Sequence, residues 1–119
     1  MNRFSLPFAL ILSLAVAGCS NSGSKAPPSQ HSAPNLILQY GCETCHVIPG
    51  VPGAVGKVGP SLESLNQRSY LAGTMSNTPA NLQQWIMHPQ SIQPGTAMPE
   101  MGVTQHDAKE ITVFLETSK

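Results

Sequence analysis

Residues 41–46 read Gly41-Cys42-Glu43-Thr44-Cys45-His46 and contain a Cys-x-x-Cys-His motif. This motif is the attachment site of a c-type haem. Two thiols at this spacing can reach the two vinyl groups of one porphyrin, and the histidine that follows is held under the ring with a nitrogen facing the iron. The motif therefore predicts one covalent haem c, attached through Cys42 and Cys45, with His46 as an axial iron ligand.

Two other chemistries use cysteines at this spacing. A structural zinc site would need two more ligands with matching spacing, and the remaining histidines form no second clustered pair: His31, His88 and His106. A redox-active dithiol belongs to a strand-helix setting, and the chain has no convincing strand pattern. The residues therefore favour haem over zinc and over a dithiol.

The composition describes a small domain of near-neutral charge. The chain has 119 residues, which predicts a single domain. Charged residues make up 10% and the formal net charge is zero, so nothing suggests a nucleic-acid partner. With only 5% aromatic residues, such a chain has difficulty burying enough apolar area alone. A haem would supply a large apolar body around which it could fold.

The N-terminus predicts export. Residues 1–18 begin with a positive charge at Arg3, continue with an interrupted apolar run over residues 4–16, and end with small residues, as a secretory signal does. The apolar run is too short for a good transmembrane helix. Attachment of a c-type haem also takes place outside the cytoplasm, so the two predictions agree.

The end of this segment, Val16-Ala17-Gly18-Cys19, resembles the lipobox of bacterial lipoproteins. The resemblance implies cleavage before Cys19, a lipid on that cysteine and a periplasmic location at a membrane. Ser20 then favours the outer membrane. The alternative is an ordinary signal with an incidental cysteine.

The rest of the chain divides into a linker and a domain. Residues 19–34 are rich in Ser and Pro and lack an apolar period, which indicates a flexible linker. Residues 35–119 are the predicted domain, with Asn35 as the cap of a first helix. Four glycines and three prolines within residues 47–60 exclude a regular helix or strand there.

Helical patterns dominate the domain. Residues 62–75 are expected to form only one or two short helical turns. Thr78 or Asn81 can cap a helix that runs to His88 and is ended by Pro89, and residues 89–103 are expected to be loop. Thr104 can cap a final helix whose apolar stripe has helical spacing: Ala108, Ile111, Phe114 and Leu115. The predicted fold class is all-α, rich in loops and built round a prosthetic group.

The second axial ligand has several candidates. Cytochromes c use Met and His together, and Met98 stands in the rigid turn Pro94-Gly95-Thr96-Ala97-Met98-Pro99, which can direct one side chain inward. The residues alone favour Met98 but leave alternatives open: Met75, Met87, Met101, His88 and His106.

Three further motifs follow the haem site in order, and together they resemble class I cytochrome c. They are Gly59-Pro60-x-Leu62, Trp85-Ile86-x-x-Pro89 and Pro94-Gly95-Thr96-x-Met98-Pro99. The resemblance covers residues 36–117 and is closest to small bacterial cytochromes and to cytochrome domains linked to respiratory oxidases. It implies a small cytochrome c fold of about three main helices, with the first and last crossing where Gly41 meets Phe114.

The resemblance also assigns the surroundings of the haem. It implies that the carbonyl of Pro60 contacts His46 and that Met98 is the second axial ligand. Trp85 would donate its indole N–H to a propionate, and Arg68 and Tyr70 are further propionate partners. The chain departs from the pattern at His88, where Asp or Asn is usual. His88 either adds a pH-dependent charge near the haem edge or simply faces solvent.

The predicted function is one-electron transfer. With both axial positions filled, no small-molecule substrate reaches the iron, so the protein is predicted to be an electron carrier, not an enzyme, with no catalytic residues. Its expected partners are redox proteins, such as a respiratory complex or terminal oxidase, and a membrane through the lipid. Two alternatives stay open: a fixed subunit of an oxidase or dehydrogenase complex, and a haem enzyme or gas sensor with a labile distal ligand.

Overall fold

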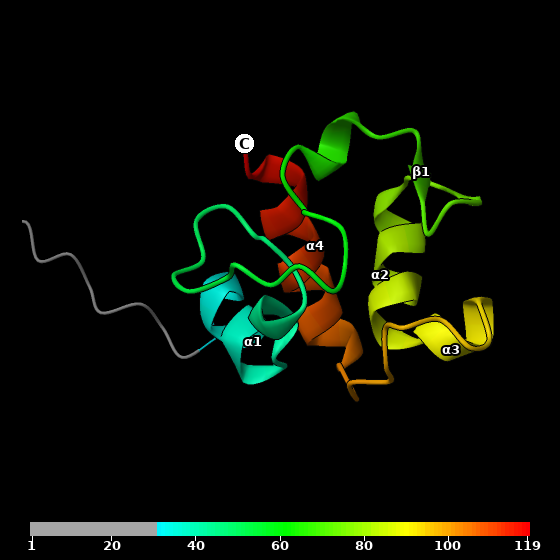
Figure 1. Ribbon diagram of the computed structural model, residues 1–119, viewed down its shortest axis with the longest axis horizontal. Coiled ribbons are helices and arrows are strands. Elements are labelled where there is room, and N and C mark those ends of the chain that lie inside the picture. The colour runs from blue at the N-terminus through cyan, green and yellow to red at the C-terminus, as the bar shows by residue number, and fades with distance from the viewer. Residues whose placement is uncertain (1–30) are drawn as a thin grey trace, which may run out of the picture.

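The computed structural model describes residues 31–119. The predicted signal peptide, the lipidation site Cys19 and Ser20 therefore lie outside the described residues. Within residues 31–119 there are four helices, two 3₁₀ turns and one short hairpin (Figure 1). Their order is α1 (Ala33–Gln39), a 3₁₀ turn (Cys42–Thr44), a second 3₁₀ turn (Leu65–Gln67), β1 (Tyr70–Leu71), β2 (Met75–Ser76), α2 (Pro79–Met87), α3 (Pro89–Ile92) and α4 (Gln105–Thr117).

Helix α1 begins earlier than the sequence suggested. Its N-cap is Ser32 and not Asn35, because Pro34 can occupy the first turn, where a backbone N–H has no helical partner. The helix ends at Tyr40, and Gly41 then adopts a φ of +72°. Glycine reaches this left-handed conformation without a Cβ clash. The chain can therefore turn from α1 directly into the Cys-x-x-Cys-His segment.

Helix α4 follows the predicted pattern. Thr104 is its N-cap, with Oγ1 accepting a hydrogen bond from the Asp107 N–H at 3.2 Å. Ala108, Ile111 and Leu115 are buried on one face, as the helical spacing predicted. These residues make α4 the central support of the core.

Helix α2 also confirms the expected start and stop, with two refinements. Thr78, and not Asn81, is the cap, and the Thr78 Oγ1 accepts from the Asn81 N–H at 3.2 Å. The helix ends at Met87 because Pro89 disfavours a helical conformation at His88, whose φ and ψ are −137° and 53°. The predicted loop that follows then opens with one helical turn, α3, which Pro89 starts.

The segment before α2 was predicted to hold only helical turns, and this was incomplete. One 3₁₀ turn is present, but β1 and β2 pair as an antiparallel hairpin with Tyr70 opposite Ser76 and Leu71 opposite Met75. Strands of two residues are too short to produce an alternating pattern that a sequence reveals. The fold is thus mainly helical with a small amount of strand.

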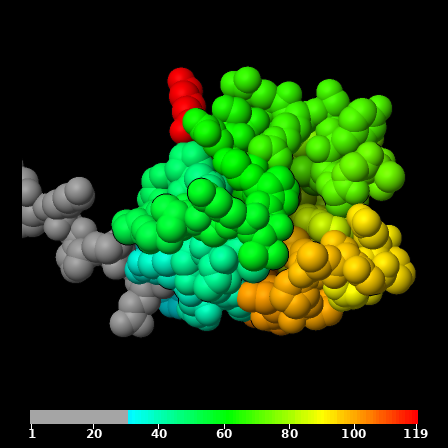
Figure 2. Space-filling view, viewed as in Figure 1, coloured from blue at the N-terminus to red at the C-terminus, as the bar shows by residue number. Residues whose placement is uncertain are grey.

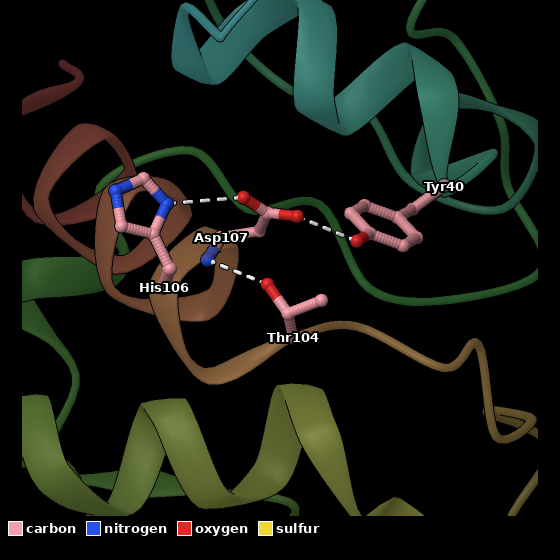
Figure 3. Close-up of polar contacts among 4 residues, drawn as sticks. All are labelled: Tyr40, Thr104, His106 and Asp107. Atoms are coloured by element: carbon pink, nitrogen blue, oxygen red, sulfur yellow. Dashed lines mark hydrogen bonds and ion pairs between the residues drawn. The ribbon is translucent and has the colours of Figure 1, made fainter.

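Helix α4 lies between α1 and α2 and contacts both (Figure 1). The contact with α1 includes a hydrogen bond from the Tyr40 hydroxyl to Asp107 Oδ2 at 2.6 Å, and Asp107 also pairs with His106 Nδ1 at 3.2 Å (Figure 3). Tyr40 thus fastens the end of α1 to the first turn of α4.

This crossing contradicts the expected contact of Gly41 with Phe114. The nearest neighbour of a Cβ at Gly41 would be Met101 Cε at 3.8 Å, whereas Phe114 lies 3.4 Å from such a position at Gly50. The reason is axial position, because Tyr40 contacts Asp107 and Phe114 lies seven residues farther along α4, about 10 Å away.

Candidate functional site

A cavity of about 420 Å³ lies between the helices and the loops that connect them. The walls of this cavity are mainly apolar, and α1, α2 and α4 each contribute residues to them. The Val, Leu and Ile members are Ile37, Ile48, Val58, Leu62, Leu65, Leu71, Leu82, Ile86, Val103, Ile111 and Leu115. Three segments, 41–60, 62–72 and 93–103, complete the lining, and the first and the last of them adjoin on the face that Figure 2 shows. The cavity is suited to a large apolar group.

The Cys-x-x-Cys-His segment forms one part of this wall. A tight turn brings its reactive side chains to the cavity, because the Cys42 carbonyl accepts from the N–H groups of both Cys45 (3.2 Å) and His46 (3.0 Å). Cys42, Cys45 and His46 all line the cavity, and both cysteines are free thiols.

The Cys42 thiol is held in its neutral form. Burial, with a smaller contribution from the negative charge of Glu43, raises its pKa to about 11. A redox-active dithiol requires the opposite, a cysteine whose pKa is lowered so that the thiolate forms. The environment of Cys42 therefore disfavours the dithiol interpretation.

His46 is held in a defined orientation. Its Nδ1 lies 2.7 Å from the Pro60 carbonyl oxygen, and since a carbonyl only accepts, Nδ1 carries the proton. In the neutral imidazole with this tautomer, the other ring nitrogen, Nε2, has a free lone pair and is able to bind a metal ion. The ring also packs against Gly59, where a Cβ would lie 2.3 Å from His46 Cε1. Only glycine fits beneath the imidazole.

Two of the candidate distal ligands line the same cavity. Met98 and Met101 both do, and both are half-buried. The other candidates are not among its lining residues: Met75, Met87, His88 and His106. The structure thus reduces the distal candidates from six to two that share a cavity with His46.

The predicted haem surroundings also line this cavity: Pro60, Arg68, Tyr70 and Trp85. Arg68 donates from Nη2 to the backbone carbonyls of Ser61 and of Glu63, the latter at 3.4 Å. A guanidinium has five N–H groups, so these bonds leave donors for a further acceptor. Tyr70 is 61% exposed and stands at the outside of the site.

Sequence reasoning missed two contributors. Gln90 does not line the cavity, but its side chain binds the loop that carries Met98. Asn77 donates to the carbonyls of Leu65 and Arg68, at 2.8 and 2.9 Å, and so holds the segment from which Arg68 extends. No local pattern marks either amide, because both act on backbone groups brought near by folding.

Two further observations limit the chemistry of residues 31–119. They contain no group of three or more His, Cys, Asp or Glu side chains placed to hold a metal ion. A structural zinc ion requires four such ligands, and residues 31–119 do not bring them together. The helices in this range are all too short or too polar to cross a membrane.

Comparison with known proteins adds one distant relative. No protein-family profile matches the chain. Over 85 residues, 71% of its length, the chain is 30% identical to cytochrome c oxidase subunit 2 of Alkalihalophilus pseudofirmus. The matched part is 24% of that protein, so the chain spans about a quarter of the relative's length.

Proposed function

We propose that this protein is a monohaem c-type cytochrome of class I, which transfers single electrons between redox proteins of a respiratory chain at a membrane surface. One observation carries the proposal. A single apolar cavity is lined by both cysteines and the histidine of the haem-attachment motif and by Met98, which is 52 residues beyond His46 in the chain.

The residues present fit a haem c. Cys42 and Cys45 would hold it by thioether bonds, and His46 and Met98 would be the ligands of its iron. The iron would supply reversible one-electron Fe(III)/Fe(II) chemistry. A thioether together with an imidazole is the ligand pair of cytochromes c, and it raises the reduction potential.

The protein's own groups prepare the site. The Pro60 carbonyl holds the Nδ1 proton of His46 and fixes the ring, while Gly59 leaves room for it. The aliphatic walls exclude water, which favours the less charged, reduced state of a bound metal centre. With His46 and Met98 both used as ligands, no position remains for a substrate. The proposal is therefore an electron carrier and not an enzyme.

The proposed partners are redox proteins such as a terminal oxidase or another respiratory complex. The similarity to an oxidase subunit supports this choice. The zero formal net charge favours brief encounters through a small, locally apolar face over strong electrostatic steering. A lipid on Cys19 would keep the domain near the periplasmic side of a membrane.

The same similarity favours a second candidate, a fixed haem-bearing subunit of an oxidase complex. Purification from membranes in mild detergent separates the two. A free carrier will elute alone, whereas a fixed subunit will elute with oxidase subunits at constant stoichiometry.

The proposal is tested with the holoprotein and Met98→Ala. The wild type should show a weak Fe–S absorption when oxidised, and carbon monoxide should bind slowly or incompletely when it is reduced. Met98→Ala should lose that absorption, bind carbon monoxide at once, and have a lower potential. Met75→Ala is the matched control, since Met75 is also half-buried but does not line the cavity, and should behave as wild type.

Two results would overturn the proposal. Absence of a covalent haem in protein made with a c-type maturation system would exclude the cytochrome. Fast and complete carbon monoxide binding to the wild type would indicate an open or labile distal site, and thus a haem enzyme or gas sensor.

A further inference from the structure

Met98 lies on a segment with little regular structure of its own. Residues 93–104, between α3 and α4, contain no helix or strand. Most side chains near Met98 are exposed, including those of Pro94, Ala97 and Pro99. Exposed loops open with little cost in free energy. The position of the Met98 sulfur must therefore depend on specific contacts made by this segment.

The side chain of Gln90 makes those contacts. Its Nε2 donates to the carbonyl oxygens of Thr96 (2.8 Å) and Met98 (2.7 Å), and its Oε1 accepts from the Gly95 N–H at 3.1 Å. This orientation of the amide is the consistent one, because the flipped amide would point its oxygen at two carbonyl oxygens. Both N–H donors and the oxygen of the Gln90 side chain thus form hydrogen bonds to the Met98 segment, residues 93–104.

Gln90 is itself firmly held. It lies in α3 directly after Pro89, whose side chain is among the most buried in the described residues. Its backbone N–H donates to Glu100 Oε1 at 3.0 Å. One residue therefore binds the segment both before and after Met98, and connects it to the helix pair α2 and α3.

We propose that Gln90 is a positioning residue that keeps the Met98 thioether in place as the distal ligand. This inference rests on the proposed function, since it assumes that Met98 is the ligand. Displacement of the segment carries the sulfur away, and this displacement must break the bonds that Gln90 donates to the Thr96 and Met98 carbonyls. Gln90 thus sets how rarely the distal position opens to an external ligand.

The size of the effect follows from the two donated bonds. Loss of one neutral hydrogen bond shifts an equilibrium about fivefold. Loss of both should raise the population of the open state about 30-fold, which corresponds to about 2 kcal/mol. The rate at which carbon monoxide binds the reduced holoprotein should increase by the same factor.

The test compares Gln90→Ala and Gln90→Glu with wild type, with Met98→Ala as the fully open reference. Gln90→Glu keeps the size and the acceptor oxygen but donates to neither carbonyl, so it should speed carbon monoxide binding about as much as Gln90→Ala. The oxidised Fe–S absorption should weaken in both variants. Gln84→Ala is the control, because Gln84 is an exposed glutamine on α2 with no side-chain bond to the Met98 segment, and it should match wild type.

The outcomes separate this inference from the proposed function. If Met98→Ala opens the site while both Gln90 variants stay within twofold of wild type, the role of Gln90 is refuted and the electron carrier stands. A fast Gln90→Ala with a wild-type Gln90→Glu would also refute it, because packing would then suffice. If Met98→Ala itself leaves carbon monoxide binding unchanged, the ligand assignment fails first.

Discussion

Gly59→Ala tests how closely the backbone supports His46. The added Cβ would lie 2.3 Å from His46 Cε1, 2.7 Å from Nδ1 and 2.9 Å from Nε2, and real Cβ contacts are essentially never shorter than 3.0 Å. The backbone at Gly59 has little freedom to withdraw, because its N–H donates to the Cys45 carbonyl at 2.8 Å. The imidazole must therefore move.

The cost has two parts. Overpacking a well-filled site costs roughly 1–3 kcal/mol, and moving the ring sacrifices its 2.7 Å bond to the Pro60 carbonyl, worth about 1 kcal/mol. We expect a loss of about 3 kcal/mol in the free energy of unfolding of the holoprotein in guanidinium chloride. The His46 Nδ1 proton, seen by NMR, should also exchange faster with water, because its acceptor has been lost.

Gly53→Ala is the matched control. Gly53 has a φ of +78° and no atom within 4 Å of an added Cβ, so only the left-handed backbone is penalised, by about 1–2 kcal/mol. His46 Nδ1–H exchange should stay as in wild type. If Gly59→Ala costs no more than Gly53→Ala and leaves that exchange unchanged, the argument that Gly59 sets the position of His46 is refuted.

Two further predictions concern the α1–α4 contact and the membrane. The hydrogen bond from the Tyr40 hydroxyl, and secondly that with His106, lowers the pKa of Asp107. The ionised Asp107 therefore stabilises the fold at pH values above its unfolded pKa of about 3.9. This stability is lost as the pH falls through the lower pKa of the folded state. Asp107→Asn should therefore lose less stability in acid than the wild type, measured by unfolding between about pH 6 and pH 2. The control Glu110→Gln removes one charge from an exposed site on α4 and should lose stability in acid as the wild type does. Equal curves of stability against pH for the two variants would contradict the assignment to Asp107. Cys19→Ser should release the protein from membranes into the soluble periplasmic fraction, and continued attachment would show that no lipid on Cys19 holds it there.

Local rules predicted the parts of the fold that depend on neighbouring residues. Thr104 and the stripe of Ala108, Ile111 and Leu115 predicted α4 correctly, because a helix cap and a helical period are written in consecutive residues. The start of α1 was placed three residues late, since Ser32 and Asn35 are both suitable caps and only packing chooses between them. The hairpin β1–β2 was missed because strands of two residues are too short to show an alternating pattern.

The candidate site divides in the same way. The sequence alone predicts the chemistry of Cys42, Cys45 and His46, because their proposed roles follow from spacing along a few residues of chain. Only the tertiary structure decided that Met98 and Met101 share a cavity with His46 while Met75 and Met87 do not line it. It alone placed Gly59 under the imidazole and Gln90 across the Met98 segment. These contacts join residues that are distant in sequence, or they bind backbone atoms. No local or periodic pattern in the sequence reveals such contacts.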